Sequence, residues 1–239
     1  MLNDKMNLKH LSYIKTLTMK YALYILLLSF VIFQSFISES YSQTIDKIFL
    51  EMPNDLYSSM SNQSKVELIE YHKARLSDTI ENRMKNKVFV IRLDTLHQIL
   101  KIQTTPVSIL ELKMCKINGQ IVVAMIRTVC APVCSSTLDF FDSRWKRTDT
   151  GFQLPHQHLW LKTCTADSLQ INQSLFQTNF ISNFVSFTFG DQDSLEVIVS
   201  NNILAYLNEE DCLRFKSCLN LDELRLVYNS TGWNYEKRP

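Results

Sequence analysis

The segment from Val107 to Phe141 constrains the fold more than any other part of the chain. Three apolar runs in it are separated by two short connections, Asn118-Gly119 and Ala131-Pro132-Val133. Asn-Gly is the preferred pair for a two-residue type I′ hairpin turn, because both central residues of that turn need a positive φ. The segment therefore predicts three antiparallel strands joined by tight turns.

The Asn-Gly turn also determines which residues of the first two strands face each other. The predicted pairs are Ile117 with Gln120, Leu112 with Met125, Met114 with Val123, Cys115 with Val122, and Lys113 with Ala124. One face of this hairpin is more apolar than the other. Such a pattern is typical of a sheet that packs against the core on one side.

Cys130 and Cys134 flank the second connection, so they are expected to lie opposite each other at the end of a hairpin. Partners in an antiparallel pair have Cα atoms about 4.5–5.5 Å apart, which is within the range of disulfides. We predict a structural disulfide that contributes about 2 kcal/mol in the loop-entropy model. The alternatives are a catalytic dithiol, which usually has two intervening residues at a helix N-terminus, and unpaired or metal-bound thiols.

The start of the chain has the pattern of an export signal. Four lysines precede an apolar run that begins at Tyr21, and Ser40-Tyr41-Ser42 fits the small-x-small pattern before a cleavage at Gln43. We therefore predict a signal peptide over residues 1–42, with Met19 as an alternative start, and export to the periplasm or the cell surface. The other interpretation is an uncleaved leader that attaches the protein to the membrane, although the run is short for a span.

Residues 43–239 are enough for one hydrophobic core, and we predict a single domain. The net charge of +1 and the lack of a basic patch predict no nucleic-acid partner. All six cysteines lie beyond residue 42, and an even number in an exported chain favours disulfides. The pairing of the other four cysteines is left open: Cys115, Cys164, Cys212 and Cys218.

Residues 44–76 have the spacing of helices. Thr44 can cap a first helix that ends before Pro53, Asn54 can cap a second, and Ser64 begins a capping-box pattern for a third. In the third helix the residues expected on the buried side are Val66, Leu68, Ile69, His72 and Leu76, with Lys65 on the exposed side. His72 is interpreted as a core histidine.

The rest of the chain adds mainly strands. Residues 88–105 predict strands before the meander, and residues 184–199 predict a hairpin. Asn208 can cap a helix, and residues 221–228 predict a last strand. We predict an α+β fold in which the N-terminal helices pack on a largely antiparallel β-meander, because a helix with one apolar face must bury it. A closed lipocalin-like β-barrel is the alternative.

His156, His158 and Cys164 are the candidate metal ligands. Alternate residues of a strand face the same way, so the two histidines can share a zinc ion. A fourth ligand and a recognisable ligand spacing are missing, and a solvated loop is the competing interpretation. We therefore predict no cofactor.

Three segments together resemble a known family. They are FLEMPNDL at 49–56, KVELIEY at 65–71 and TVCAPVCS at 128–135. Their order after a leader is similar to an uncharacterised family of small exported Bacteroidetes proteins, a domain of unknown function, over most of residues 44–239. The resemblance implies an exported single-domain protein and assigns no activity or site residues. The long leader before Met19 departs from the family pattern.

No catalytic residues are predicted. The sequence has no G-x-S-x-G elbow, and nothing in it assembles a nucleophile, a base and an oxyanion site. The function we expect is a non-enzymatic periplasmic or cell-surface binding or interaction module that disulfides stabilise, with an unknown partner. The alternative is an exported enzyme, either a thiol oxidoreductase that uses Cys130 and Cys134 or a metal-dependent hydrolase that uses His156 and His158.

Overall fold

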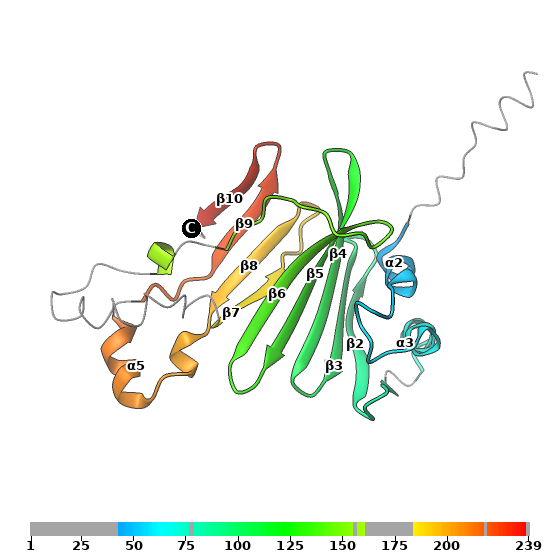
Figure 1. Cartoon of the computed structure of the whole chain (residues 1–239), viewed down its shortest axis with the longest axis horizontal. Helices are drawn as coiled ribbons and strands as arrows, with labels where there is room; N and C mark the ends of the chain where they lie inside the picture. Colours follow the sequence, from blue (N-terminus) through cyan, green and yellow to red (C-terminus); the bar gives the residue numbers. More distant parts are fainter. Residues whose placement is uncertain (1–42, 77–78, 155–156, 161–183, 218, 238–239) are drawn as a thin grey trace, which may run out of the picture. The chain divides into compact units, whose positions relative to one another are not determined.

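The protein contains two antiparallel sheets and two N-terminal helices (Figure 1). The computed structural model describes residues 43–76, 79–154, 157–160, 184–217 and 219–237. Within these ranges, no helix has both the length and the apolar character needed to cross a lipid bilayer.

The first sheet is a six-stranded meander in which every strand pairs with its neighbour in the sequence. Its strands are β1 (Thr79–Glu81), β2 (Lys87–Asp94), β3 (Ile99–Thr105), β4 (Ser108–Ile117), β5 (Gln120–Cys130) and β6 (Cys134–Asp142). Asn118 and Gly119 have φ angles of 51° and 78°, as a type I′ turn requires. All five residue pairs predicted from this turn are confirmed, from Ile117 with Gln120 to Leu112 with Met125.

The second sheet has the strand order β10-β9-β8-β7. Its strands are β7 (Val185–Phe189), β8 (Glu196–Asn201), β9 (Leu224–Asn229) and β10 (Gly232–Lys237). The β9–β10 hairpin was not predicted, because its turn has no Asn-Gly pair. The turn instead depends on the Asn229 side chain, whose Oδ1 accepts a hydrogen bond of 2.9 Å from the Thr231 backbone N–H, and on Gly232 with φ 108°.

Helices α2 (Ile45–Glu51) and α3 (Asn62–Ala74) pack on one face of the six-stranded sheet. Thr44 is the N-cap residue of α2 as predicted, but its side chain makes no capping hydrogen bond, and the chain leaves the helix at Met52. The predicted short helix after Asn54 is wrong, because residues 54–59 form turns. The prediction of Ser64 as the cap is also wrong: Ser61 is the N-cap of α3, and its Oγ accepts a hydrogen bond of 3.1 Å from the Ser64 N–H.

The orientation of α3 differs from the prediction. Lys65 is fully buried, whereas Val66 and Leu76 are 39% and 63% exposed. The buried face contains Lys65, Leu68 and Ile69, which follow the i, i+3, i+4 spacing of one helix side. Lysine fits there because its long stem is apolar and its ammonium donates a hydrogen bond to the Met52 carbonyl at the end of α2.

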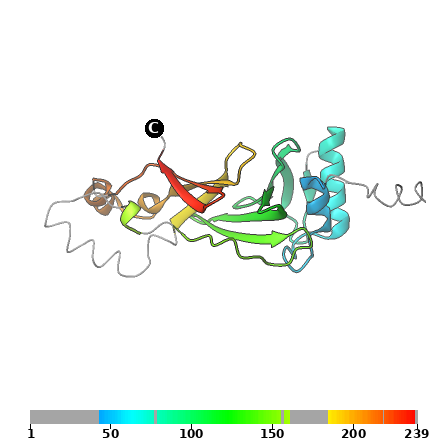
Figure 2. The same ribbon diagram turned by 90° about the horizontal axis from the view of Figure 1, so that it is seen from above.

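Both faces of the six-stranded sheet are packed, so the prediction of a single packed side is wrong. The helices and one face form a cluster around Phe49, Leu112 and Phe141. The other face packs against the second sheet around Ile126 and Val197. Figure 2 shows the helices and the second sheet on opposite sides of the six-stranded sheet. The second layer comes from residues 185–237, so the pattern of residues 107–141 carries no signal of it.

The predicted α+β class is confirmed, and the meander does not close into a lipocalin-like barrel. Strands β1 and β6 are the two edges of the first sheet, and they do not pair with each other. Helix α5 (Glu209–Lys216) follows Asn208, whose Oδ1 accepts a hydrogen bond of 2.8 Å from the Asp211 N–H, as predicted for its cap. Two short 3-10 helices, η1 (Gln157–Trp160) and η3 (Ile203–Ala205), complete the regular structure of the described residues.

Candidate functional site

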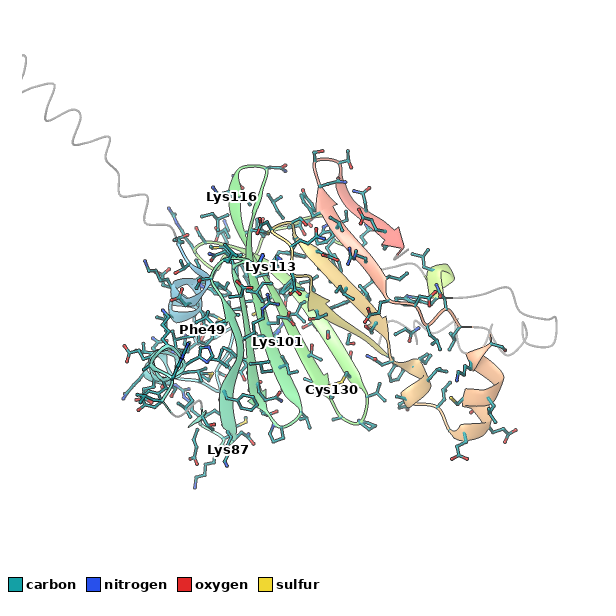
Figure 3. The ribbon with its side chains drawn as sticks, turned by 180° about the vertical axis from the view of Figure 1, so that it is seen from behind. Phe49, Lys87, Lys101, Lys113, Lys116 and Cys130 are labelled. Atoms are coloured by element: carbon teal, nitrogen blue, oxygen red, sulfur yellow. A yellow bond between two sulfur atoms is a disulfide. The ribbon has the colours of Figure 1, made fainter. Side chains whose placement is uncertain are left out.

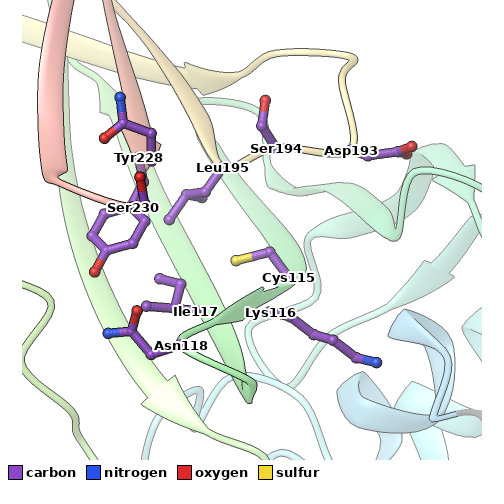
Figure 4. Close-up of a pocket in the computed structure, with 10 residues that line it drawn as sticks. Cys115, Lys116, Ile117, Asn118, Asp193, Ser194, Leu195, Tyr228 and Ser230 are labelled. Atoms are coloured by element: carbon purple, nitrogen blue, oxygen red, sulfur yellow. The ribbon is translucent and has the colours of Figure 1, made fainter.

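A pocket lies where three chain reversals meet (Figure 4). It is lined by residues 115–118 at the end of β4, residues 193–195 before β8, and residues 228–230 at the end of β9, and its volume is about 390 Å³. We call it the turn pocket. Because its walls come from both sheets, it exists only when the two sheets are packed together.

The interior of the turn pocket is apolar. Ile117 and Leu195 are 8% and 3% exposed, and the Tyr228 ring is half-buried beside them. Alternation along β4 turns Cys115 and Ile117 toward the second sheet. The Tyr228 ring is held by an edge-to-face contact with Trp233, with 5.4 Å between the ring centroids. The floor is therefore made of side chains fixed by packing.

Cys115 contributes a thiol to this interior. Figure 4 shows its sulfur directed into the turn pocket. The thiol is free, and its Sγ lies 3.8 Å from the Val122 carbonyl oxygen, to which it donates. Burial raises the pKa of this thiol to about 11, although the nearby Lys113 ammonium acts in the opposite direction. At neutral pH the group is therefore a protonated thiol and a weak nucleophile.

The rim of the turn pocket carries uncharged polar groups. Within the described part of the chain, the side chains of Asn118, Ser194 and Ser230 make no hydrogen bonds of their own. An amide and two hydroxyls can each donate and accept. The two charged lining residues, Lys116 and Asp193, direct their charged ends away from the interior (Figure 4). The pocket thus offers hydrogen bonds at its rim and no charge inside.

A buried lysine holds the loop that forms one wall of the turn pocket. Lys113 projects from β4 toward the second sheet and is fully buried. Its Nζ donates hydrogen bonds of 3.0 Å to the Gly190 carbonyl and 2.5 Å to the Gln192 carbonyl. Burial lowers the pKa of Lys113. These two carbonyl oxygens are therefore occupied by the Lys113 ammonium, which holds the loop against the first sheet.

A second cation reaches the same loop from β2. Arg92 forms ion pairs with Asp191 of the loop and, at 2.5 Å, with Asp94 of its own strand. The hydrogen bond from Arg92 lowers the pKa of Asp191. The Asp94 carboxylate also lies 2.8 Å from the His97 Nδ1. Side chains of the first sheet therefore attach the β7–β8 loop at two points.

Gly190 allows the loop to pass close to a buried carboxylate. A Cβ at this position would lie 2.2 Å from Glu196 Oε2 and 2.4 Å from Glu196 Cδ, so the Glu196 side chain would have to move. The other oxygen, Glu196 Oε1, lies 2.5 Å from Arg225 Nε of β9. The absence of a side chain at residue 190 therefore leaves room for the Glu196 carboxylate beside the loop.

Glu111 binds the edge of β7 to the first sheet. Its buried Oε1 accepts a hydrogen bond of 3.0 Å from the Phe189 backbone N–H, and both of its oxygens accept from the Thr188 hydroxyl at 3.1 Å. Lys101 Nζ lies 3.3 Å from Glu111 Oε2. Ser136 Oγ accepts a further bond of 3.0 Å from the Phe187 N–H. Side chains of the first sheet thus accept hydrogen bonds from backbone N–H groups at the edge of β7. Without them, these N–H groups could pair with another strand.

Cys130 and Cys134 are opposite each other in the β5–β6 register and form a disulfide, with 3.8 Å between their Cα atoms. This bond closes the end of the sheet opposite the Asn118-Gly119 turn, because β5 runs from Gln120 to Cys130. Figure 3 shows Lys116 and Cys130 at these opposite ends. The disulfide and the turn pocket are therefore separate features.

The predicted metal ligands are not brought together by anything the structure describes. His156 and Cys164 lie outside the described residues, and of His158 only the backbone, in η1, is described. Among the described residues, no three metal-ligating side chains are grouped so that they could hold an ion. Cys212 is a second free thiol, half-buried in α5, and Cys218 lies outside the described residues.

Sequence reasoning missed the turn pocket. It identified Asn118-Gly119 as a turn and residues 184–199 as a hairpin, but each of these is a local feature. No local pattern indicates the pocket, because it forms only when segments that are far apart in the sequence pack together.

The fold and the pocket define a class: a two-sheet α+β protein with N-terminal helices on its larger sheet and a small pocket among its turns. Residues 37–233 match a family model described as a protein of unknown function, DUF3256. Since the match spans most of the chain, the chain belongs to this family. A comparison with curated proteins found no match.

The chain is also similar to a solved structure, that of a domain of an uncharacterized protein from Porphyromonas gingivalis W83. The TM-score is 0.67 at 18% sequence identity, and the similarity covers 81% of this chain and 98% of that chain. At this identity the similarity shows the fold alone. The predicted resemblance to a family of unknown function is confirmed. The similar solved structure comes from a Bacteroidetes organism.

Proposed function

We propose that this protein is an exported, non-enzymatic binding module that holds its ligand in the turn pocket. The pocket is the observation that carries this proposal. Its volume of about 390 Å³ falls in the usual range of small-ligand sites, about 300–1,000 Å³. It combines an apolar interior with a few polar groups at the rim, which is the usual composition of such sites.

The disulfide supports export. Disulfides persist in oxidising compartments and are rare in the cytosol, and the Cys130–Cys134 bond joins the ends of two neighbouring strands. The apolar leader before Gln43 has the pattern of a signal peptide. Both features lead us to expect the protein in the periplasm or on the cell surface.

The chemistry of the pocket supports binding without catalysis. Its thiol is protonated at neutral pH, since burial raises the pKa of Cys115 to about 11. As far as the described residues go, no histidine lines the pocket, and its acid, Asp193, points outward. A reaction needs an activated nucleophile or a positioned base, and these lining residues supply neither.

Export is tested by mass spectrometry of the protein isolated from its host, before and after reduction, with labelling of free thiols. We expect a chain that begins at Gln43 and carries the Cys130–Cys134 bond. A chain that retains its leader and has both thiols free would contradict export, and would favour a membrane-anchored redox or metal role.

Binding is tested with the purified chain and a library of small fragments, detected by saturation-transfer NMR. We expect bound fragments to slow the alkylation of Cys115, because its sulfur faces the interior of the pocket. Cys212 is the internal control: it is a free thiol in α5, away from the pocket, and its alkylation rate should not change. Fragments that bind without protecting Cys115, or a library in which nothing binds, would overturn the proposal.

A further inference from the structure

We infer that the turn pocket binds a neutral saccharide, with one sugar ring lying against Tyr228. This inference rests on the proposed function, because it names the ligand class of the same pocket. A sugar ring has an apolar C–H face and a periphery of hydroxyls that both donate and accept hydrogen bonds. Three properties of the turn pocket match that chemistry: a fixed aromatic ring, uncharged rim groups, and an interior without charge.

The aromatic ring is held in place before any ligand arrives. Trp233 contacts the Tyr228 ring with 5.4 Å between centroids, and its own position is fixed by Phe152 at 5.0 Å and Phe140 at 5.8 Å. The Trp233 Nε1–H donates a hydrogen bond of 3.1 Å to the Thr150 carbonyl. The Tyr228 ring is already immobilised by these contacts. Binding of a ligand to it therefore costs little side-chain entropy.

The rim supplies hydrogen bonds of the required kind. The Asn118 amide offers both donors and an acceptor, and the hydroxyls of Ser194 and Ser230 each do both. The other rim amide, that of Asn229, is used on its acceptor side: its Oδ1 accepts from the Thr231 N–H at 2.9 Å and from the Asn234 Nδ2 at 2.9 Å. Asn118 is therefore the rim amide that still offers an acceptor as well as donors to a ligand.

The charges around the pocket favour a neutral ligand. Lys113 lies behind the pocket wall and is committed to the carbonyls of Gly190 and Gln192. Lys116 and Asp193 point outward (Figure 4) and have opposite signs. A charged group taken into this interior would lose its hydration without gaining an ion partner, which is strongly unfavourable.

The test is saturation-transfer NMR with glucose, galactose, mannose and N-acetylglucosamine, together with the charged sugars glucuronic acid and glucosamine. We expect at least one neutral sugar to bind and to slow the alkylation of Cys115, and the charged sugars to bind at least about tenfold more weakly. Equal binding of the charged sugars would overturn the inference.

Two variants and a matched control localise the binding. Tyr228→Ala removes the stacking ring, and Asn118→Gly removes the amide while keeping the turn, since residue 118 has φ 51° and glycine adopts positive φ freely. Each should weaken sugar binding about tenfold. Tyr235→Ala is the control, because Tyr235 is an exposed tyrosine of the same hairpin that does not line the pocket. Unchanged binding in both pocket variants would contradict the inference.

The two proposals fail in different ways. If fragments protect Cys115 and no sugar binds, the pocket is a binding site for another class of ligand, such as a peptide side chain, and only the saccharide assignment is wrong. If neither fragments nor sugars protect Cys115, both proposals are wrong. Circular dichroism and thermal unfolding of each variant show whether lost binding reflects a lost fold.

Discussion

Lys65 and Lys113 are both fully buried, and backbone carbonyl oxygens accept hydrogen bonds from both ammonium groups. The helix lysine bonds to the carbonyl at the end of α2, and the sheet lysine bonds to the β7–β8 loop. In each case a long side chain passes through the core and ends at a backbone group that needs a partner. Burial lowers the pKa of both lysines.

The lowered pKa of Lys65 makes stability depend on pH. Because the folded-state pKa lies below the unfolded value of 10.5, the unfolded chain binds more protons between the two values, so stability rises with pH in that window. We predict that Lys65→Met loses the part of this rise that Lys65 contributes, whereas Lys113, whose pKa is also lowered by burial, keeps its own part. The measurement is urea unfolding at several pH values from 7 to 10.

Lys87→Met is the control for this experiment, since Lys87 is an exposed lysine at the start of β2. Its free energy of unfolding should follow the wild-type pH dependence. A Lys65→Met variant whose stability keeps the wild-type slope above pH 7 would show that the burial of this ammonium has no effect on its protonation.

At the level of elements, the β7–β8 loop is the part whose position depends most on distant contacts. Lys113 and Arg92 attach it from the first sheet, and the buried Glu196 lies close to its first residue, Gly190. Lys113 and Arg92 come from strands that are far from the loop in the sequence, whereas Glu196 directly follows it. The loop forms one wall of the turn pocket, so loss of these contacts should disorder that wall.

Gly190→Ala tests the close approach in this loop. The added methyl would lie 2.2 Å from Glu196 Oε2, so we predict a loss of about 1–3 kcal/mol in the free energy of unfolding. Because the strain falls on the Glu196–Arg225 pair, amide hydrogen exchange should increase in residues 190–195. Chemical denaturation and exchange mass spectrometry measure the two effects.

Gly119→Ala is the comparison for that variant. Nothing lies within 4 Å of a Cβ at Gly119, whose φ is 78°, so its effect is limited to backbone strain in the β4–β5 turn. Exchange in residues 190–195 should then stay at the wild-type level. If Gly190→Ala leaves both stability and loop exchange unchanged, the carboxylate has room to move and the close approach is not required.

At the scale of the molecule, the six-stranded sheet is shared by two hydrophobic cores. Val123 and Phe141 face the helices, while their neighbours Ala124 and Phe140 face the second sheet. Residues 122–126 of β5 thus support one core or the other in alternation, and neither core can form fully without this strand. We expect the two cores to unfold in one cooperative transition.

Phe49→Ala tests this cooperation. Phe49 is fully buried between α2 and the sheet, and its truncation should lower the free energy of unfolding by about 3–5 kcal/mol. Hydrogen exchange should accelerate by the same factor in β3 and in β8, although β8 packs on the opposite face. Phe89→Ala, at a phenylalanine of β2 that is 37% exposed, should have a much smaller effect. Acceleration confined to β3 would mean that the second sheet unfolds independently.

Much of the local structure could be predicted because its causes are local. The Asn118-Gly119 turn determines the β4–β5 register through backbone φ angles, and the spacing of Cys130 and Cys134 places them opposite each other at a hairpin end. Asn208 caps α5 with its own side chain. The turn between β9 and β10 was missed although it is also local, because its support comes from an Asn side chain rather than from an Asn-Gly pair.

The sequence by itself thus determined the strands from Val107 to Phe141, the β4–β5 register, the pairing of Cys130 with Cys134 and the position of the N-terminal helices before them. Only the tertiary structure decided that Lys65 is buried, that both faces of the sheet are covered, and that three turns form one pocket. The physical reason is distance along the chain. Turns and caps use hydrogen bonds within a few residues, whereas burial and pocket formation depend on which segments, here as far apart as Cys115 and Tyr228, pack together when the chain folds.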